Sequence, residues 1–153
     1  MNLDANNPLA GLRIWQQNLN NSLTAQLSLI NGPIADQWDV LALQEPAFDR
    51  RSGLTKANSH WRVVYPTIKH MNDSRPRAIS FVNSKLSTNN WKQIPFPSRD
   101  VVIIQFMDTL GNCTIINIYN DGKSNLVMVA SYLSSSYLIS ASILSFTLSM
   151  AVA

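Results

Sequence analysis

The only glutamate of the 153-residue chain, Glu45, ends an apolar run of strand length and is followed at once by Pro46. Residues 40–44 predict a buried strand, and the proline predicts that the strand stops directly after the carboxylate. In open α/β sheets, ligands bind outside the carboxyl ends of the strands. A carboxylate at that place suits Mg²⁺ or Mn²⁺, which take oxygen ligands from proteins. The alternative is an acid that only faces water at the end of a strand.

The chain is long enough for one domain with a sizeable core, and its two ends differ from that domain. Residues 1–11 predict a flexible N-terminus, which lacks the basic start and apolar stretch of a secretory signal. Residues 12–122 carry the strand and helix patterns of an α/β domain. Residues 123–153 form a separate tail, in which nothing after Lys123 is charged.

The tail is rich in serine, leucine and alanine, and we expect it to be helical. Three interpretations of it stay open. Its length would span a bilayer, although serines are frequent and no basic flank follows. It would otherwise be a soluble helix that lacks a charged face. The abrupt change of composition favours a third interpretation, in which the tail is a frameshifted or unspliced translation.

Between these ends, hydrophobic periodicity predicts an alternation of strands and helices. A strand over residues 12–17, a helix over 22–30 with a short second piece reaching 38, and a strand over 40–44 form a βαβ-like unit. Further strands are predicted over 61–65 and 78–82, and a hairpin over 101–107 and 113–119. Residues 83–100 are expected to be largely irregular. The fold class is therefore α/β, with a mixed sheet and flanking helices.

The middle of the chain is strongly basic. Residues 50–99 contain ten lysines and arginines and one acid, Asp73, which gives this segment a net charge of +9. Such a segment suits a polyanion, because phosphates attract these side chains and counterion release adds affinity. A solvated basic surface without a partner is an equally good explanation. Cys113 is the only cysteine and lies in an apolar run, so we interpret it as a core residue, and no Cys/His cluster has zinc spacing.

Polar side chains follow three of the predicted strands. Asn18 follows the first, Glu45 the second, and Tyr119 and Asn120 end the last. We expect them to meet on one rim of a sheet, as an amide, a carboxylate and a phenol. That set suits phosphodiester chemistry, in which the carboxylate holds a divalent ion, the amide orients it or a phosphate oxygen, and the phenol donates a hydrogen bond to the phosphate.

At these motifs the sequence resembles the endonuclease/exonuclease/phosphatase superfamily, which has the fold of deoxyribonuclease I. The residues that carry the resemblance are segment 12–20, Leu43-Gln44-Glu45-Pro46 and Ile116-Asn117-Ile118-Tyr119-Asn120. The endonuclease domains of fungal non-LTR retrotransposon polyproteins are most similar, through segment 61–66, Arg77 before a strand, and Tyr119-Asn120-Asp121. The resemblance covers residues 12–122 and implies an intracellular, nuclear protein that acts on DNA.

The resemblance assigns roles to particular residues. Glu45 corresponds to the family's metal-binding glutamate, Asn18 to the asparagine that supports the metal site, and Tyr119 to the tyrosine that contacts the phosphate. Asn120 directly follows the tyrosine and is a further catalytic candidate. The implied cofactor is Mg²⁺ or Mn²⁺. Three arginines are candidates for contacts with the nucleic-acid backbone: Arg62, Arg75 and Arg77.

The sequence also departs from the family pattern. A Gly-Asp-x-Asn motif and a Ser-Asp-His motif should follow, but no histidine occurs after His70 and no aspartate after Asp121. We therefore expect an incomplete DNase I-like sandwich with one apolar sheet face uncovered, marginal stability, and little or no cleavage. The alternative function is non-catalytic nucleic-acid binding by residues 50–99, with Trp61, Tyr65 and Trp91 stacking on bases. No stable protein partner is predicted, and membrane association through the tail is a third alternative.

Overall fold

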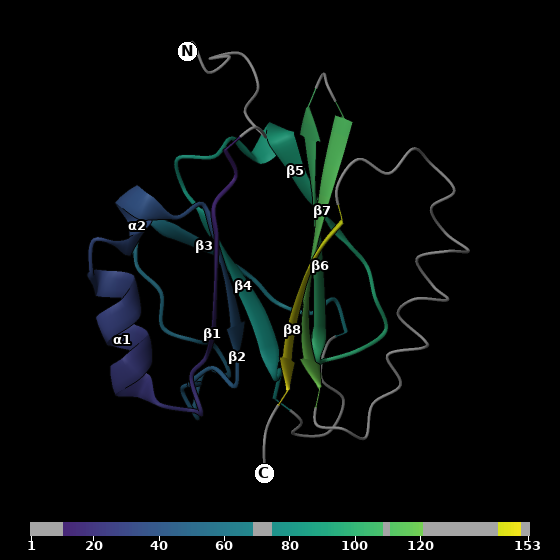
Figure 1. Cartoon of the computed structure of the whole chain (residues 1–153). Helices are drawn as coiled ribbons and strands as arrows, with labels where there is room; N and C mark the ends of the chain where they lie inside the picture. The colour runs from purple at the N-terminus through teal and green to yellow at the C-terminus, as the bar shows by residue number, and fades with distance from the viewer. Residues whose placement is uncertain (1–10, 69–74, 109–110, 121–143, 151–153) are drawn as a thin grey trace.

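The computed structural model describes residues 11–68, 75–108, 111–120 and 144–150, which form two facing four-stranded sheets (Figure 1). The first sheet has the order β1–β2–β4–β3 and the second β5–β6–β7–β8. The first consists of β1 (Ile14–Asn18), β2 (Val40–Gln44), β3 (Trp61–Val64) and β4 (Ala78–Asn83). The second consists of β5 (Trp91–Ile94), β6 (Val101–Asp108), β7 (Gly111–Asn120) and β8 (Leu144–Met150). The helical elements are α1 (Leu23–Asn31), α2 (Ile34–Gln37) and the 3₁₀ turn η1 (Thr88–Asn90).

The β1–α1–β2 unit positions the candidate site, because β1 and β2 are parallel neighbours that end side by side. Asn18, the last residue of β1, lies opposite Gln44, the last residue of β2. The helix between them begins after Ser22, whose Oγ accepts a hydrogen bond from the backbone N–H of Ala25 at 3.2 Å. This cap satisfies one of the free N–H groups of the first turn. The predicted βαβ-like unit is thus present.

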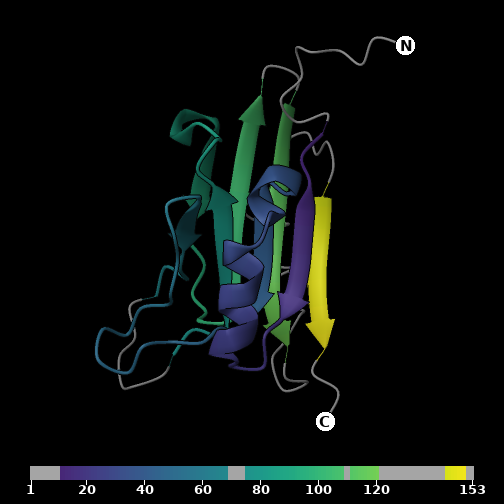
Figure 2. The ribbon, with the colours of Figure 1, turned by 90° about the vertical axis from the view of Figure 1, so that its left-hand side faces the viewer.

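The first sheet is covered on both faces. On the outer face, Leu41 and Leu43 of β2 belong to one apolar cluster with Ile30 of α1, which Figure 2 shows lying in front of this sheet. On the inner face, Val40 belongs to a second cluster with Ile104 of β6 and residues of β7. The expectation of an uncovered face is therefore wrong for this sheet, because the second sheet forms within the described residues and packs against it.

A chain of buried amides links the two sheets in the middle of this apolar interface. The Nε2 of Gln44 donates to Oδ1 of Asn117 at 2.6 Å, and Nδ2 of Asn117 donates to the backbone oxygen of Ile79 at 2.7 Å. The Nε2 of Gln16 donates to Oε1 of Gln44 at 2.9 Å. Because buried amides are costly unless they are hydrogen-bonded, this network fixes the register between the sheets.

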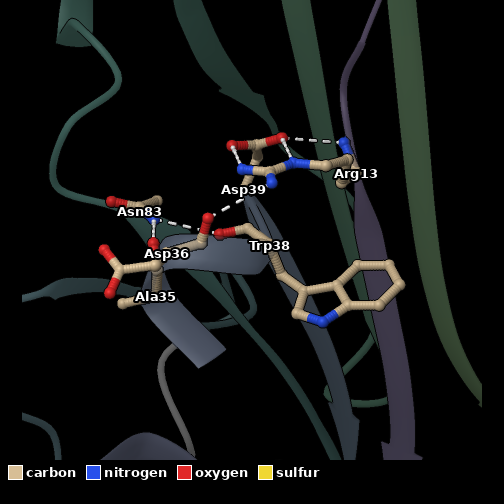
Figure 3. A network of polar contacts seen from close by, with 6 residues as sticks. All are labelled: Arg13, Ala35, Asp36, Trp38, Asp39 and Asn83. Carbon is tan, nitrogen blue, oxygen red and sulfur yellow. Dashed lines mark hydrogen bonds and ion pairs between the residues drawn. The ribbon is translucent and has the colours of Figure 1, made fainter. Parts of the chain in front are cut away.

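A second polar network lies where β2 begins, at the opposite end of the strand from Glu45 (Figure 3). The backbone N–H and Nε of Arg13 donate to Oδ2 of Asp39 at 2.8 and 3.1 Å, and Nη2 donates to Oδ1 at 3.1 Å. The Nδ2 of buried Asn83 donates to the backbone oxygens of Ala35 and Trp38 at 2.7 and 2.9 Å. These contacts join β1, α2 and β4 to the segment that enters β2.

One expectation about secondary structure is incomplete and another is wrong. Residues 84–87 and 95–100 are turns and irregular backbone, as expected, but η1 and β5 lie between them, and β5 pairs antiparallel with β6. The tail is not helical over Leu144–Met150, which form β8 and pair in parallel with β7. The sequence of β8 alternates apolar and polar residues, Leu-Ser-Phe-Thr-Leu-Ser-Met, which is the period of a strand. The rest of the tail lies outside the described residues, and among those that are described no helix is long and apolar enough to cross a membrane.

Candidate active site

Glu45 takes a left-handed backbone conformation directly after β2. Its φ is 46°, which non-glycine residues adopt at a cost of about 1 kcal/mol or more. Two backbone hydrogen bonds hold it there. Its N–H donates to the oxygen of Arg77 at 2.8 Å, and its own oxygen accepts from the N–H of Asn21 at 2.8 Å. These bonds tie Glu45 to the turn after β1 and to the residue before β4, and so fix the direction of its carboxylate. The side chain of Glu45 is half-buried.

Tyr119 reaches Glu45 from the other sheet. Its hydroxyl donates to Oε1 of Glu45 at 2.7 Å, and its side chain is buried. Since Tyr119 lies in β7, the expectation that one sheet would carry the whole site is wrong. The two groups do converge, but across the gap between the sheets, because the facing sheets bring the ends of β2 and β7 together.

Arg77 and Asp100 complete this cluster. The Nε of Arg77 donates to Oδ1 of Asp100 at 2.8 Å, and a second hydrogen bond joins Nη2 to Oδ2, so that the pair is bidentate. The guanidinium carbon of Arg77 lies 4.7 Å from the centre of the Tyr119 ring, within the range of a cation–π contact. The backbone N–H of Tyr119 donates to the oxygen of Asp100 at 2.8 Å. Arg77 thus packs on the phenol that holds Glu45, and its contact with nucleic acid stays a prediction.

Asn18 lies beside this cluster at the end of β1. Its Oδ1 accepts a hydrogen bond from the backbone N–H of Asn20 at 2.8 Å, which closes a turn on its own side chain. Asn20 and Asn21 both have positive φ, 48° and 57°. Asparagine tolerates this conformation better than other non-glycine residues, so the asparagine run suits the sharp turn between β1 and α1.

Asn120 is separated from Glu45 by the pleat of β7. Successive side chains of a strand point to opposite faces, and Tyr119 faces the first sheet. Asn120 therefore lies on the face of Ile116 and Ile118, which belong to a third apolar cluster. Asn120 is buried there, and the structure does not bring it to the carboxylate.

The other two candidate arginines lie in different places. Arg62 in β3 is opposite Val82, which pairs with Val40 at the start of β2, so it lies at the far end of the sheet from Glu45. Its Nη1 donates to the backbone oxygen of Leu86 at 2.8 Å. Arg75 is exposed and lines a pocket beside the site.

The aromatic residues proposed for stacking on bases are mostly inside the protein. Trp61 is 4% exposed and packs in the outer core near Phe81, so it cannot stack on a base. Trp91 packs near Phe106 with its Nε1 buried, and Tyr65 accepts a hydrogen bond at its hydroxyl from the backbone N–H of Thr55.

Cys113 is half-buried, as a core residue would be, and burial raises the pKa of its thiol. A raised pKa lowers the thiolate fraction at neutral pH, so Cys113 is a poor nucleophile.

Sequence reasoning missed three residues that build this site. Gln44 and Asn117 form the amide link just beneath it, and Asp100 holds Arg77. Gln44 and Asn117 are the polar members of two otherwise apolar strands, which is a usable signal, since a buried amide requires a partner. Nothing in the sequence around Asp100, apart from its place before β6, indicates that it pairs with Arg77.

The donor set fits one magnesium ion held mainly by solvent. Tyr119 occupies Oε1 of Glu45, and the contacts of the described residues leave Oε2 available. No group of three His, Cys, Asp or Glu side chains is close enough to hold a metal within the described residues. Mg²⁺ commonly keeps several waters and takes one or two carboxylates, with substrate phosphates supplying further oxygens. The single carboxylate of Glu45 meets the lower end of that requirement.

No family model and no curated protein matches the sequence. Two solved structures share its fold. One is the endonuclease domain of TRAS1, a telomere-specific non-LTR retrotransposon, with a TM-score of 0.55 and 16% identity over 82% of this chain and 54% of that one. The other is the AP endonuclease LMAP from Leishmania major, with a TM-score of 0.52 and 12% identity over 82% of this chain and 45% of that one. The chain thus spans about half the length of each. At this identity the likeness shows the fold alone, and the predicted incomplete DNase I-like α/β fold is confirmed.

Proposed function

We propose that the chain carries the metal-binding part of a nuclease-type site that acts on the phosphodiester backbone of DNA. The observation that supports this most strongly is the 2.7 Å hydrogen bond from Tyr119 to Glu45 across the two sheets. The sequence separation of these residues is 74, and the contact lies at the strand ends where the fold concentrates chemistry. The endonuclease fold of both structural relatives agrees with it.

In this proposal Glu45, with help from Asn18, would hold Mg²⁺ or Mn²⁺, which would neutralise phosphate charge and make a water more acidic. The Tyr119 hydroxyl has one proton to donate. It orients the carboxylate of Glu45 in the free protein, and it would turn that proton to a phosphate oxygen when substrate is bound. Arg77 and Asp100 hold the tyrosine ring in place.

Metal binding by calorimetry tests the assignment. We expect weak binding of Mg²⁺ or Mn²⁺ to the full chain, because one protein carboxylate is available, and we expect Glu45→Gln to abolish it. Asp36→Asn is the matched control, since Asp36 is an exposed carboxylate at the far end of the sheet and should leave binding unchanged. Equal binding by wild type and Glu45→Gln would show that the metal is held elsewhere.

Plasmid nicking tests activity separately. We expect little or no cleavage by the 153-residue chain with Mg²⁺, because phosphodiester cleavage also requires an oriented water and a group that stabilises charge on the phosphate. His60 lies at the far end of the sheet, where its backbone oxygen accepts from Ser84, so it is not placed to supply that group. Robust, EDTA-sensitive nicking that Glu45→Ala abolishes would contradict this expectation.

A second candidate function is nucleic-acid binding without cleavage. The observation in its favour is the surface beside Glu45, where Arg50, Arg51, Lys56 and Arg75 line one pocket. Filter binding over a salt series separates the two functions. Binding that persists in EDTA and in Glu45→Gln, without metal-dependent nicking under any condition, would favour the second.

A further inference from the structure

A pocket of about 540 Å³ opens next to Glu45 and is distinct from the Glu45–Tyr119 contact. Two of its lining residues tie it to the site. Ala47 follows Glu45 by two residues, and Asn21 donates its backbone N–H to the oxygen of Glu45. The volume is within the range of about 300–1,000 Å³ that bound small molecules occupy. The pocket therefore has room for one group of nucleotide size beside the carboxylate.

The pocket is cationic, with four cations and one acid in its described lining. Among the described residues, the side chains of Arg50, Arg51, Lys56 and Arg75 form no ion pair or side-chain hydrogen bond. The one acid in the lining, Asp49, is turned into its own loop. Its Oδ1 accepts from the backbone N–H groups of residues 51 and 52, both at 2.9 Å. Asp49 and Lys56 attract each other by charge, but four cations against one carboxylate leave the described lining with a net positive charge, so the pocket suits an anion.

The lining also contains apolar side chains. Leu23 at the start of α1 is 45% exposed, and Phe48 is half-buried. A phosphate alone would gain nothing from such side chains, whereas a base or a sugar would. Cations for phosphate and apolar or aromatic side chains for bases are the combination used to hold single-stranded nucleic acid.

We propose that this pocket binds one unpaired nucleotide of a nucleic-acid strand, with its phosphate among Arg50, Arg51, Lys56 and Arg75 and its base against Leu23 and Phe48. The inference rests on the proposed function, whose substrate it specifies. A base inside a duplex is stacked and cannot enter a pocket, so the nucleotide next to the Glu45 site must be single-stranded or turned out of the helix. The pocket thus favours single-stranded or distorted DNA over an intact duplex.

Fluorescence anisotropy with a labelled oligothymidylate tests the charges, in EDTA and over a series of salt concentrations. Neutralising one pocket cation, as in Arg75→Gln or Lys56→Gln, should lower the slope of log K against log salt by about 0.7 and weaken binding roughly fivefold at low salt. Lys92→Gln is the matched control, because Lys92 is an exposed cation of the same basic segment outside the pocket. Equal effects of Lys92→Gln and the pocket variants would overturn the proposal in favour of a general basic surface.

The base contact is tested with an abasic strand of the same length and charge. Wild type should bind the oligothymidylate more tightly than the abasic strand, and Leu23→Ser, at an exposed position, should remove that difference while leaving abasic binding unchanged. A blunt duplex of equal length should bind more weakly than the single strand. Equal binding of all three nucleic acids by wild type would overturn the assignment of an unpaired nucleotide.

Failure of this inference can be distinguished from failure of the proposed function. Glu45→Gln should not weaken oligothymidylate binding in EDTA, since the pocket needs no metal and the change removes a negative charge beside it. If the pocket variants weaken strand binding but calorimetry finds no metal bound at Glu45, the proposed function is wrong and the nucleotide pocket stands. If metal binds at Glu45 but the pocket variants do not change strand binding, the nucleotide pocket is wrong and the proposed function stands.

Discussion

The two ends of the first sheet use the same kinds of side chain with different results. Where β2 begins, the charges are paired, Arg13 with Asp39 and Lys85 with Asp36. Where β2 stops, Arg77 is paired with Asp100, but four more cations line a pocket whose described lining holds one acid, Asp49, and no ion pair. The first end is stabilised by its own contacts, whereas the second retains charge that only a ligand would neutralise.

This difference separates structural from functional polar groups more clearly than residue type does. Asn83 and Asn18 are both asparagines at strand ends. Asn83 is buried, and its amide donates hydrogen bonds to two backbone oxygens. Asn18 is half-buried beside the carboxylate and accepts one hydrogen bond within its own turn. Substitutions at the first end should therefore change stability alone, and those at the second end should change binding as well.

The largest expected effect on stability comes from Asn83→Ala. The change removes three hydrogen bonds, which leaves the backbone oxygens of Ala35 and Trp38 without this donor and the N–H of Lys85 without this acceptor, so the free energy of unfolding should fall by about 2–3 kcal/mol. Urea unfolding measures it, with the exposed Asn89→Ala as control. Oligonucleotide binding at temperatures where the variant is folded should be unchanged. A loss of binding there would contradict the division between the two ends.

A smaller effect is expected from breaking the pair at the functional end. Arg77→Gln or Asp100→Asn should each lower the free energy of unfolding by about 1.5 kcal/mol, because the side chains are 27% and 11% exposed and solvent screens part of the interaction. A double-mutant cycle measures the coupling between them. Arg77→Lys should recover part of the stability but not the bidentate contact. Weaker metal binding in Arg77→Gln would show that the pair positions the site through Tyr119.

Local patterns predicted the first half of the fold well. Periodicity predicted a helix over residues 22–30, one residue from α1 at each end, and the apolar run of residues 40–44 coincides with β2. Those elements are determined by short-range signals that the sequence carries directly. The position of Glu45 at the end of β2 follows from the same run and from Pro46, which is why the metal candidate could be located before the fold was known.

The pairing of distant segments could not be obtained in this way. Periodicity shows that residues 113–119 form a strand, but which sheet contains it depends on contacts far along the chain. The sheet assignment of Tyr119 was therefore wrong, although its meeting with Glu45 was expected from the strand ends at which the two residues lie. The alternation in Leu144–Met150 was visible, but the lack of charge drew attention to a helix instead.

The smallest predicted effect compares one carboxylate from each end, Asp36 and Asp49. The Lys85 ammonium, through a hydrogen bond and its charge, lowers the pKa of Asp36, and hydrogen bonds from the backbone N–H groups of Ser52 and Arg51 lower the pKa of Asp49. A carboxyl with a lower pKa in the folded state stabilises the protein above its unfolded value, near 3.8, and loses that contribution as the pH falls further.

Asp36→Asn and Asp49→Asn should each flatten the fall of stability below about pH 4, because each removes one such group. Salt should then separate them. The Asp36–Lys85 pair has side chains that are 77% and 66% exposed, so added salt should screen it and shrink the difference between wild type and Asp36→Asn. The loop hydrogen bonds of Asp49 are short-range contacts at 2.9 Å, so its difference should persist. Urea unfolding at pH 3 to 6, about the range in which aspartates titrate, with and without added salt provides the measurement. If salt erased both differences equally, the Asp49 loop would be held by charge attraction to the pocket cations, and those cations would not be free for a ligand.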